Sequence, residues 1–416
     1  MGDDHRGRTG RHLGRTSTVR KYWHCLRQPY ALRLLAVNFL GRLPNGMGAL
    51  ATVLFLRAND VSYGRVGAVA AVYGVCTAIG SPVLGRIVDR RGQSTTLLVG
   101  AVGSGAGFAL LAWLGGSSFP AALAGVAVAG FFMPPLEPAL RSMWPSVLPD
   151  ASTVEVAYAL DTALQNILFV AGPLVVVLLV GATSTTTTLL VIGVLGVLGT
   201  LLYTANPPVR RWRGEQRPRH WAGALRSPLL VVLLAGMLFV GAVVGVFNVA
   251  TVAYAERTGA PGFSGVLLGA FSVGSLVGGL AYGARSWSGE PLRRLLWLLV
   301  AMAACTWPLV VVADRPTMVV LITFAGLGLA PVLTCTFVLI GKVARRGTVT
   351  EAFAWVTAVF LGGSAAGSGA AGAVLPHLGL APTFAVAGIA ATLAFLVVLS
   401  APSFARSDSE AGADLR

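Results

Sequence analysis

Three ionisable residues, Arg42, Glu137 and Asp161, lie inside long apolar stretches of this sequence. If those stretches cross a bilayer, each charge is costly to hold there and is a functional candidate by default. A carboxylate paired with an arginine stays ionised, whereas one released from its partner in a partly dry cavity takes up a proton more readily. We therefore predict that Arg42 pairs with Glu137 or Asp161 in one conformation and releases it in another, so that substrate and proton compete for one site. A permanent structural ion pair, or a Glu137–Arg141 pair near the membrane surface, is the alternative.

Uncharged polar residues extend two of these positions along helical faces. Asn38 and Asn45 share a face with Arg42, and Gln165 follows Asp161 by one helical turn. A polar face inside a membrane should look into a cavity or at partner residues, although packing between helices competes as an explanation for any single residue. Aromatic residues with few polar groups favour an amphipathic organic substrate over a sugar. The candidates for lining the cavity are Asn38, Asn45, Gln165, Asn166, Asn248, Thr251 and Trp355.

The apolar stretches that hold these residues number twelve. Of the 416 residues, 55% are hydrophobic and 11% are charged, and the mean hydropathy is +0.75. Soluble domains carry about 25% charged residues, and about twenty apolar residues make one helical crossing of a bilayer. The predicted fold class is therefore an all-α membrane protein with twelve transmembrane helices. We place the spans at 34–56, 66–86, 95–114, 119–140, 156–181, 185–205, 229–254, 263–284, 292–313, 316–340, 351–375 and 379–402.

The positive charges are distributed unevenly among the connecting segments. The formal net charge is +15, and 26 of the 31 lysines and arginines fall on one set of loops and tails, with Arg141 counted among them, whereas four flank the other set. Because positive residues mark the cytoplasmic side, we expect a multi-pass protein of the cytoplasmic membrane with both termini in the cytoplasm. The basic loops are expected to contact anionic lipid, and no nucleic acid is expected as a partner.

The longest internal polar segment divides the spans into two groups of six. We predict a basic N-terminal tail (1–33), a first six-helix bundle (34–205), a central loop (206–228), a second bundle (229–402) and a C-terminal tail (403–416). Glycines recur between spans two and eight at an offset of 198 residues, and AYALDTA (157–163) matches AFAWVTA (352–358) at an offset of 195. These matches indicate two pseudo-symmetric bundles. Glycine-rich runs such as 362–372 are expected where the two halves slide past each other.

The loop between spans two and three reads GSPVLGRIVDRRGQ (80–93) and carries the most specific motif. Its glycines allow close helix contact, its aspartate can face a helix N-terminus, and its arginines hold the cytoplasmic side. The loop resembles the signature of the major facilitator superfamily, which runs Gly-x-x-x-Asp-Arg-x-Gly-Arg/Lys, and Gln93 departs from it at the last position. The residues assigned to the motif are Gly85, Asp89, Arg90, Arg91 and Gly92.

The resemblance implies a fold, a mechanism and several roles. In the family this loop latches the two halves together, which would place Asp89 near Glu351. Spans one, four, seven and ten line the family's cavity, so Asn248 would face Asn45. Gly172-Pro173 in span five is similar to the family's antiporter signature, which implies efflux. Family antiporters often carry an arginine early in span four, and FPAALAGVAVAG (119–130) has none, which weakens proton coupling.

The expected function is alternating-access export of a small amphipathic compound in exchange for protons. An uncoupled facilitator or importer of a small metabolite is the alternative, and a transporter-like sensor or scaffold that moves nothing is the alternative of another class. An enzyme is not expected, because the five histidines are scattered over tails and loops. No metal site, no cofactor beyond a proton gradient and no ATP-binding glycine loop are predicted, and we expect a monomer.

Overall fold

The computed structural model describes residues 18–214, 223–260, 263–285, 287, 289–345 and 347–401. The predicted tail 403–416 lies outside these residues, as do residues 1–17 of the N-terminal tail and residues 215–222 of the central loop. The described chain is helical and contains no strand.

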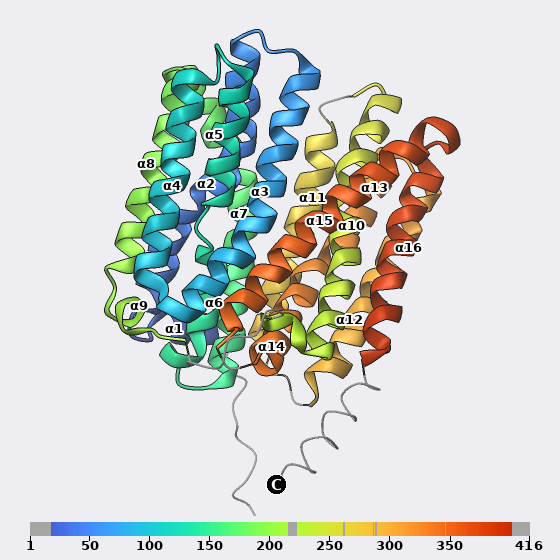
Figure 1. Ribbon diagram of the computed structural model, residues 1–416. Helices are drawn as coiled ribbons and strands as arrows, with labels where there is room; N and C mark the ends of the chain where they lie inside the picture. The colour runs from blue at the N-terminus through green and yellow to red at the C-terminus, as the bar shows by residue number, and fades with distance from the viewer. Residues whose placement is uncertain are drawn as a thin grey trace, which may run out of the picture.

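Twelve helices or helix pairs are long and apolar enough to cross a membrane, which confirms the predicted fold class. They form two bundles, which stand side by side in Figure 1. The first bundle consists of α2 (Ala31–Ala58), α3 (Tyr63–Arg91), α4 (Gln93–Leu114), α5 (Phe119–Phe131), α6 (Leu136–Val147), α7 (Ala151–Ala182) and α8 (Thr185–Thr204). The second consists of α10 (Pro228–Arg257), α11 (Phe263–Ala284), α12 (Pro291–Thr306) with its 3₁₀ extension Trp307–Val311, α13 (Arg315–Leu327), α14 (Leu329–Val343), α15 (Val349–Leu378) and α16 (Leu380–Leu399).

Within the described residues, three short helices lie outside the spans. The N-terminal helix α1 (Thr18–Leu26) precedes the first span, and α9 (Pro207–Arg211) and a 3₁₀ turn at Gly223–Arg226 lie in the segment between the bundles. In Figure 1, α1 and α9 lie at the same end of the molecule, which we call the α1 end. Cys25 on α1 is fully buried, so α1 packs on the bundles. The segment 1–33, which was predicted as a basic tail, therefore contains a packed helix.

The fourth span is broken into α5 and α6 at its prolines. Pro134 and Pro135 lie between the two helices, and a proline in a helix interior removes a backbone donor and clashes with the preceding turn. The span continues to Val147, which corrects the predicted end at residue 140. This correction matters because Arg141, which was counted among the loop arginines, lies inside the span and is fully buried.

Side-chain caps fix where several helices begin. The Asp150 carboxylate accepts a hydrogen bond of 2.8 Å from the Thr153 N–H at the start of α7. That bond holds the pKa of the exposed Asp150 carboxyl below its usual value. Ser184 caps α8 in the same way, accepting from the Thr187 N–H at 3.0 Å, so the segment between α7 and α8 is a true helix boundary.

Glycines bring helices of the same bundle into contact. A Cβ at Gly363 or Gly367 of α15 would collide with the backbone of α10, and one at Gly274 or Gly278 of α11 would collide with the backbone of α13. Gly283 of α11 does face the first bundle, since a Cβ there would collide with the Ala159 side chain of α7. For the other four glycines, the expectation of a position between the two halves is wrong. Their close approach fixes the internal packing of the second bundle.

The two bundles meet at the α1 end. In Figure 1, α15 crosses α3 there, close to α6 and α14. The polar contacts described below join the bundles at this end and at mid-depth, and they hold it shut in this conformer.

Candidate functional site

Four charged side chains form a closed ring in the interior of the first bundle. Arg42 of α2 donates to Asp161 of α7 at 2.6 Å and to Glu137 of α6 at 3.0 Å. Arg141 of α6 also contacts both carboxylates, through Nε to Asp161 at 2.6 Å and through Nη1 to Glu137. We call these four residues the quartet. Each arginine bridges both acids, and each acid bridges both arginines.

The local sequence explains why the ring closes. The chain restarts as α6 at Leu136, so Glu137 falls in the first turn, and Arg141 lies one turn further on the same face. Arg42 and Asp161 follow the first residues of α2 and α7 by eleven and ten positions, which places both about 15 Å along their helices. All four therefore meet well inside the membrane-spanning segments, away from the ends of α2 and α7.

The quartet is balanced in charge and sealed from solvent. The side chains of Arg42, Arg141 and Asp161 are at most 3% exposed, and that of Glu137 is 6% exposed. An unpaired charge at this depth is expensive, whereas two arginines and two carboxylates leave no net charge in the ring. A proton placed on either acid leaves one positive charge without its counterion.

Two amides extend the quartet. Gln165 accepts from Arg141 Nη2 at 3.1 Å and donates to Glu137 at 3.0 Å. It lies one helical turn beyond Asp161, on the side away from the α1 end. Asn38 donates to the Leu136 carbonyl at 2.8 Å and so ties α2 to the start of α6. Sequence reasoning included both amides among the cavity-lining candidates, and the structure places them around the charges.

Arg141 is the member that sequence reasoning missed. Arg42 was expected to pair with one of the two carboxylates, and in the structure it pairs with both. The Glu137–Arg141 pair, which was expected near the membrane surface, is buried inside the ring. The signal was available in the sequence, because Arg141 follows Glu137 by one helical turn.

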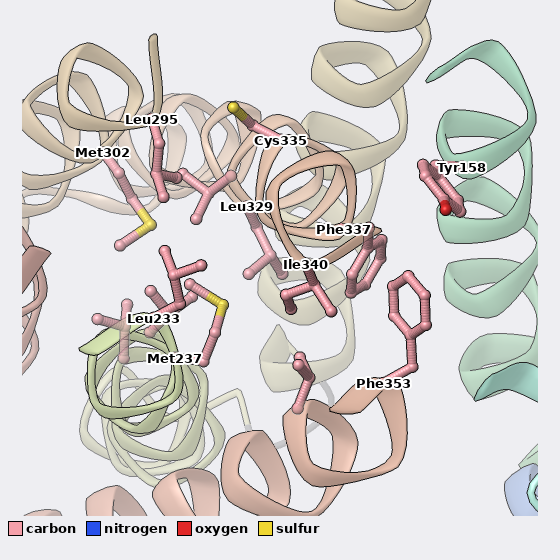
Figure 2. Packing of buried hydrophobic residues seen from close by; sticks show 14 of the residues in the cluster. Tyr158, Leu233, Met237, Leu295, Met302, Leu329, Cys335, Phe337, Ile340 and Phe353 are labelled. Carbon is pink, nitrogen blue, oxygen red and sulfur yellow. The ribbon is translucent and has the colours of Figure 1, made fainter. Parts of the chain in front are cut away.

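An aromatic cluster covers Arg141. The Phe337 ring of α14 lies 3.6 Å from the guanidinium carbon, close enough for a cation–π contact, and the Tyr158 hydroxyl donates to the Arg141 carbonyl at 3.3 Å. Figure 2 shows Tyr158, Phe337 and Phe353 gathered together, with ring centroids 5.9 to 6.2 Å apart. Tyr158 belongs to the first bundle, and the two phenylalanines belong to the second. The cluster therefore seals the quartet across the bundle interface.

The motif loop closes the interface closer to the α1 end. The two Asp89 oxygens accept the backbone N–H groups of Thr350 at 3.1 Å and Glu351 at 2.9 Å, at the start of α15. These N–H groups have no partner within the helix, and the positive end of the helix dipole favours the carboxylate. Arg86 pairs with Glu351 at 2.5 Å. We call Arg86, Asp89, Thr350 and Glu351 the latch.

The other motif residues shape the loop. Gly85 packs against α15, since a Cβ there would lie 3.2 Å from the Thr350 carbonyl. Gly92 joins α3 to α4 with φ of +94°, a conformation that favours glycine, whereas Arg90 and Arg91 are exposed. Sequence reasoning did not identify the role of Arg86, although it lies one turn before the motif arginines.

A second ion pair joins the bundles through a different pair of helices, α7 and α12. Glu155 of α7 pairs with Arg294 of α12 at 3.0 Å. At mid-depth, Asn166 of α7 donates to the Ser275 hydroxyl of α11 at 3.2 Å, which ties the same two bundles. Asn166 thus serves as an interbundle contact in this conformer.

The remaining candidates stand apart from the quartet. Asn45 and Asn248 are exposed, and Trp355 is half-buried. Thr251 is buried and donates to the Phe247 carbonyl of its own helix at 2.7 Å, the bond expected of a packed threonine. Gly172 packs directly against the backbone of Gly46 on α2.

Gly172-Pro173 lies within α7, and the helix continues through it to Ala182. Among the described residues, no group of three or more His, Cys, Asp or Glu side chains is arranged to hold a metal ion.

Comparisons with known proteins agree with this architecture. The sequence profile described as "Major Facilitator Superfamily" matches residues 34–316. No curated protein sequence matches the chain. A bacterial homologue of the iron transporter ferroportin in an outward-facing state has a TM-score of 0.70 at 15% identity, covering 89% of this chain and 99% of that one.

Two further transporter structures are similar. The human organic anion transporter MFSD10 (TETRAN) has a TM-score of 0.66 at 16% identity, covering 89% of this chain and 100% of that one. The E. coli fucose:proton symporter FucP has a TM-score of 0.69 at 14% identity, covering 92% and 99%. At these identities the likeness concerns the fold alone, and it is a fold of transporters rather than of enzymes.

Proposed function

Because this chain belongs to the Major Facilitator Superfamily, we propose that it is a secondary active transporter that exports a small amphipathic organic compound in exchange for protons by alternating access. The quartet is the observation that carries the proposal. A purely structural bundle gains little from four buried charges, since apolar residues of similar volume fill such a space at equal or lower free energy.

The α1 end is the cytoplasmic side in this proposal. The uneven distribution of positive residues supports that orientation, because basic segments are retained on the cytoplasmic side. The latch, the Glu155–Arg294 pair and the aromatic cluster hold this end shut, so the conformer corresponds to an outward-facing state. The similar ferroportin homologue is also described in an outward-facing state.

Glu137 is the proposed first proton acceptor. It is the most exposed member of the quartet, and Gln165 contacts it from the side away from the α1 end. Its protonation releases Arg42 and Arg141 from one partner and leaves a positive charge without its counterion. Opening of the α1 end then withdraws Phe337 from Arg141, admits water and lets the proton leave toward the cytoplasm.

The substrate class follows from the chemistry around the site. The quartet satisfies most of its own hydrogen bonds, and the surrounding groups are aromatic and aliphatic with few amides. Such surfaces suit an amphipathic compound, whereas a sugar requires many hydrogen-bonding side chains.

An uncoupled facilitator remains the second candidate. The observation that favours it is the completeness of the ring, because a self-neutral network also serves as a permanent brace. In that case, neutral replacement of a carboxylate alters stability and leaves the ratio of gradient-driven to passive flux unchanged.

Uptake into proteoliposomes with an imposed pH gradient tests the proposal. A panel of amphipathic cations, anions and neutral compounds is scanned with the wild-type protein and with Arg42→Ala and Asp161→Asn. We expect both variants to lose gradient-driven transport while remaining folded. Glu256→Gln, at an exposed carboxylate at the opposite end of the molecule, is the matched control and should retain it. Full gradient-driven flux in both quartet variants would falsify the proposed coupling.

A further inference from the structure

The short helix α1 presents two different faces at the α1 end of the molecule. Tyr22 and Cys25 lie on the face that packs against the bundles. Arg20, Trp23 and Arg27 recur at spacings of three and four residues and are exposed on the other face. The first membrane span begins at Ala31, four residues beyond the last of these. The exposed face of α1 is therefore held close to the membrane surface.

The packed face of α1 touches both bundles. The Tyr22 hydroxyl donates to the Leu280 carbonyl of α11 at 2.6 Å, in the second bundle. The Cys25 thiol is fully buried and lies 3.9 Å from the Thr153 carbonyl of α7, in the first bundle. The close packing of Tyr22 against α11 is also marked at Gly283, where a Cβ would collide with the tyrosine hydroxyl. Thus α1 bridges the two bundles through α7 and α11, at the same end of the molecule as the latch.

The exposed face of α1 combines an aromatic ring with positive charge. Trp23 is 55% exposed, and the Arg27 guanidinium carbon lies 4.9 Å from its ring centroid. Arg20 precedes Trp23 by one helical turn and is also exposed. Tryptophan favours the headgroup level of a bilayer, and arginines on an amphipathic helix are attracted to anionic headgroups. No acidic residue lies within 18–33, and the acid close enough to act on Cys25 and His24 is the single Asp150 carboxylate at the start of α7.

We propose that α1 is a binding surface for anionic phospholipid, which Arg20, Trp23 and Arg27 engage at the membrane surface, and that lipid bound there stabilises the conformer closed at the α1 end. The partner is inferred from charge complementarity and from the position of α1 directly before a membrane span. Lipid binding itself does not depend on the proposed export. Its effect on conformation rests on alternating access.

The physical link is the bridging role of α1. Opening of the α1 end must separate Leu280 from Thr153, so α1 cannot keep both contacts. If the anionic lipid surface holds α1 in the bridging position better than in the open conformer, it shifts the equilibrium toward closure by that difference in affinity. One basic residue near an anionic surface changes binding by about fivefold.

Binding is tested by fluorescence quenching in nanodiscs that contain the full chain. Brominated phosphatidylglycerol or brominated phosphatidylcholine is included at equal mole fraction, and subtraction of the Trp23→Phe signal isolates the Trp23 component. We expect the anionic lipid to quench Trp23 more strongly, and Arg20→Gln/Arg27→Gln to remove the difference. Equal quenching by the two lipids overturns the proposal.

A control variant at the same end of the molecule distinguishes a site on α1 from a general effect of surface charge. Arg210 and Arg211 of α9 are also exposed at the α1 end, so Arg210→Gln/Arg211→Gln removes the same charge elsewhere. The preference of Trp23 for the anionic lipid should survive this change. An equal loss in the α9 variant assigns the effect to the whole basic surface and contradicts a site on α1.

The conformational link is tested through the thiol of Cys25. In a variant that keeps Cys25 alone, phosphatidylglycerol should slow alkylation of the buried thiol at least fivefold relative to phosphatidylcholine. Arg20→Gln/Arg27→Gln should abolish this protection. If the alkylation rate is the same in both lipids while the anionic lipid still quenches Trp23 more strongly, the lipid site stands and its effect on conformation is refuted.

Discussion

Replacement of Asp89 by asparagine should loosen the closed end without disturbing the substrate site. The Asp89 carboxylate accepts two backbone N–H groups at the start of α15 and lies against the positive end of that helix. An asparagine keeps one acceptor oxygen and loses the charge. The loss of a charge-assisted cap of this kind costs about 1–2 kcal/mol. The ratio of closed to open conformers should therefore fall roughly 5- to 30-fold.

Electron–electron distance measurements read this ratio directly. Spin labels at Arg90→Cys and Arg345→Cys, in a background without the native cysteines, report on exposed positions of the two bundles at the α1 end. We expect Asp89→Asn to transfer population from the short-distance peak to a longer one, and to slow turnover while leaving substrate affinity nearly unchanged. Glu256→Gln at the opposite end is the control and should leave the distribution as in the wild type.

Two results would refute this reasoning. The first is an unchanged distance distribution in Asp89→Asn, which would mean that the capping interaction adds nothing to closure. The second is a large loss of substrate affinity at normal turnover, which would move Asp89 from the latch into the binding site.

Three further outcomes follow from the site. Arg141→Gln leaves a buried carboxylate short of one partner and should lower the free energy of unfolding by about 3–5 kcal/mol. The double variant Arg141→Gln/Glu137→Gln should recover part of that loss, as measured in a double-mutant cycle by thermal denaturation in detergent. Phe337→Ala removes the ring over Arg141 and should cost about 3–5 kcal/mol in the same assay, whereas the volume-conserving Phe337→Met should cost much less. Burial raises the pKa of the Cys25 thiol to about 11, so the neutral thiol dominates at pH 8, and its alkylation rate should rise about tenfold per pH unit between pH 8 and pH 10. A rate that levels off above about pH 9, as expected of an exposed thiol with an ordinary pKa, would show that the thiol is not buried in the membrane-embedded protein.

The helices could be predicted from hydropathy because each crossing repeats one simple requirement. A bilayer core leaves backbone groups without water, so a long apolar run must be a helix. The break at Pro134 and Pro135 has an equally local cause, since a proline acts within its own segment. Asp89 was predicted near Glu351 from the motif, and the structure places its carboxylate at the start of α15.

The partners of the buried charges could not be predicted from the sequence in the same way. Arg141 was counted with the loop arginines, and one of its two carboxylate partners, Asp161, lies 20 residues away on another helix. The spacing of glycines on α15 predicts which face of the helix is closely packed, but it does not identify the helix that packs there. The contact with α10 was therefore mistaken for a contact between the two halves. Long-range pairing is the information that local patterns lack.

The central claim is that the quartet exchanges a proton for substrate, and one measurement tests it most directly. Proteoliposomes that contain Glu137→Gln or Asp161→Asn are compared with the wild type in two assays: counterflow of a transported compound without a gradient, and accumulation driven by a pH gradient. The account predicts that at least one neutral variant retains counterflow and that neither accumulates substrate. Accumulation at the wild-type level in both variants would contradict it.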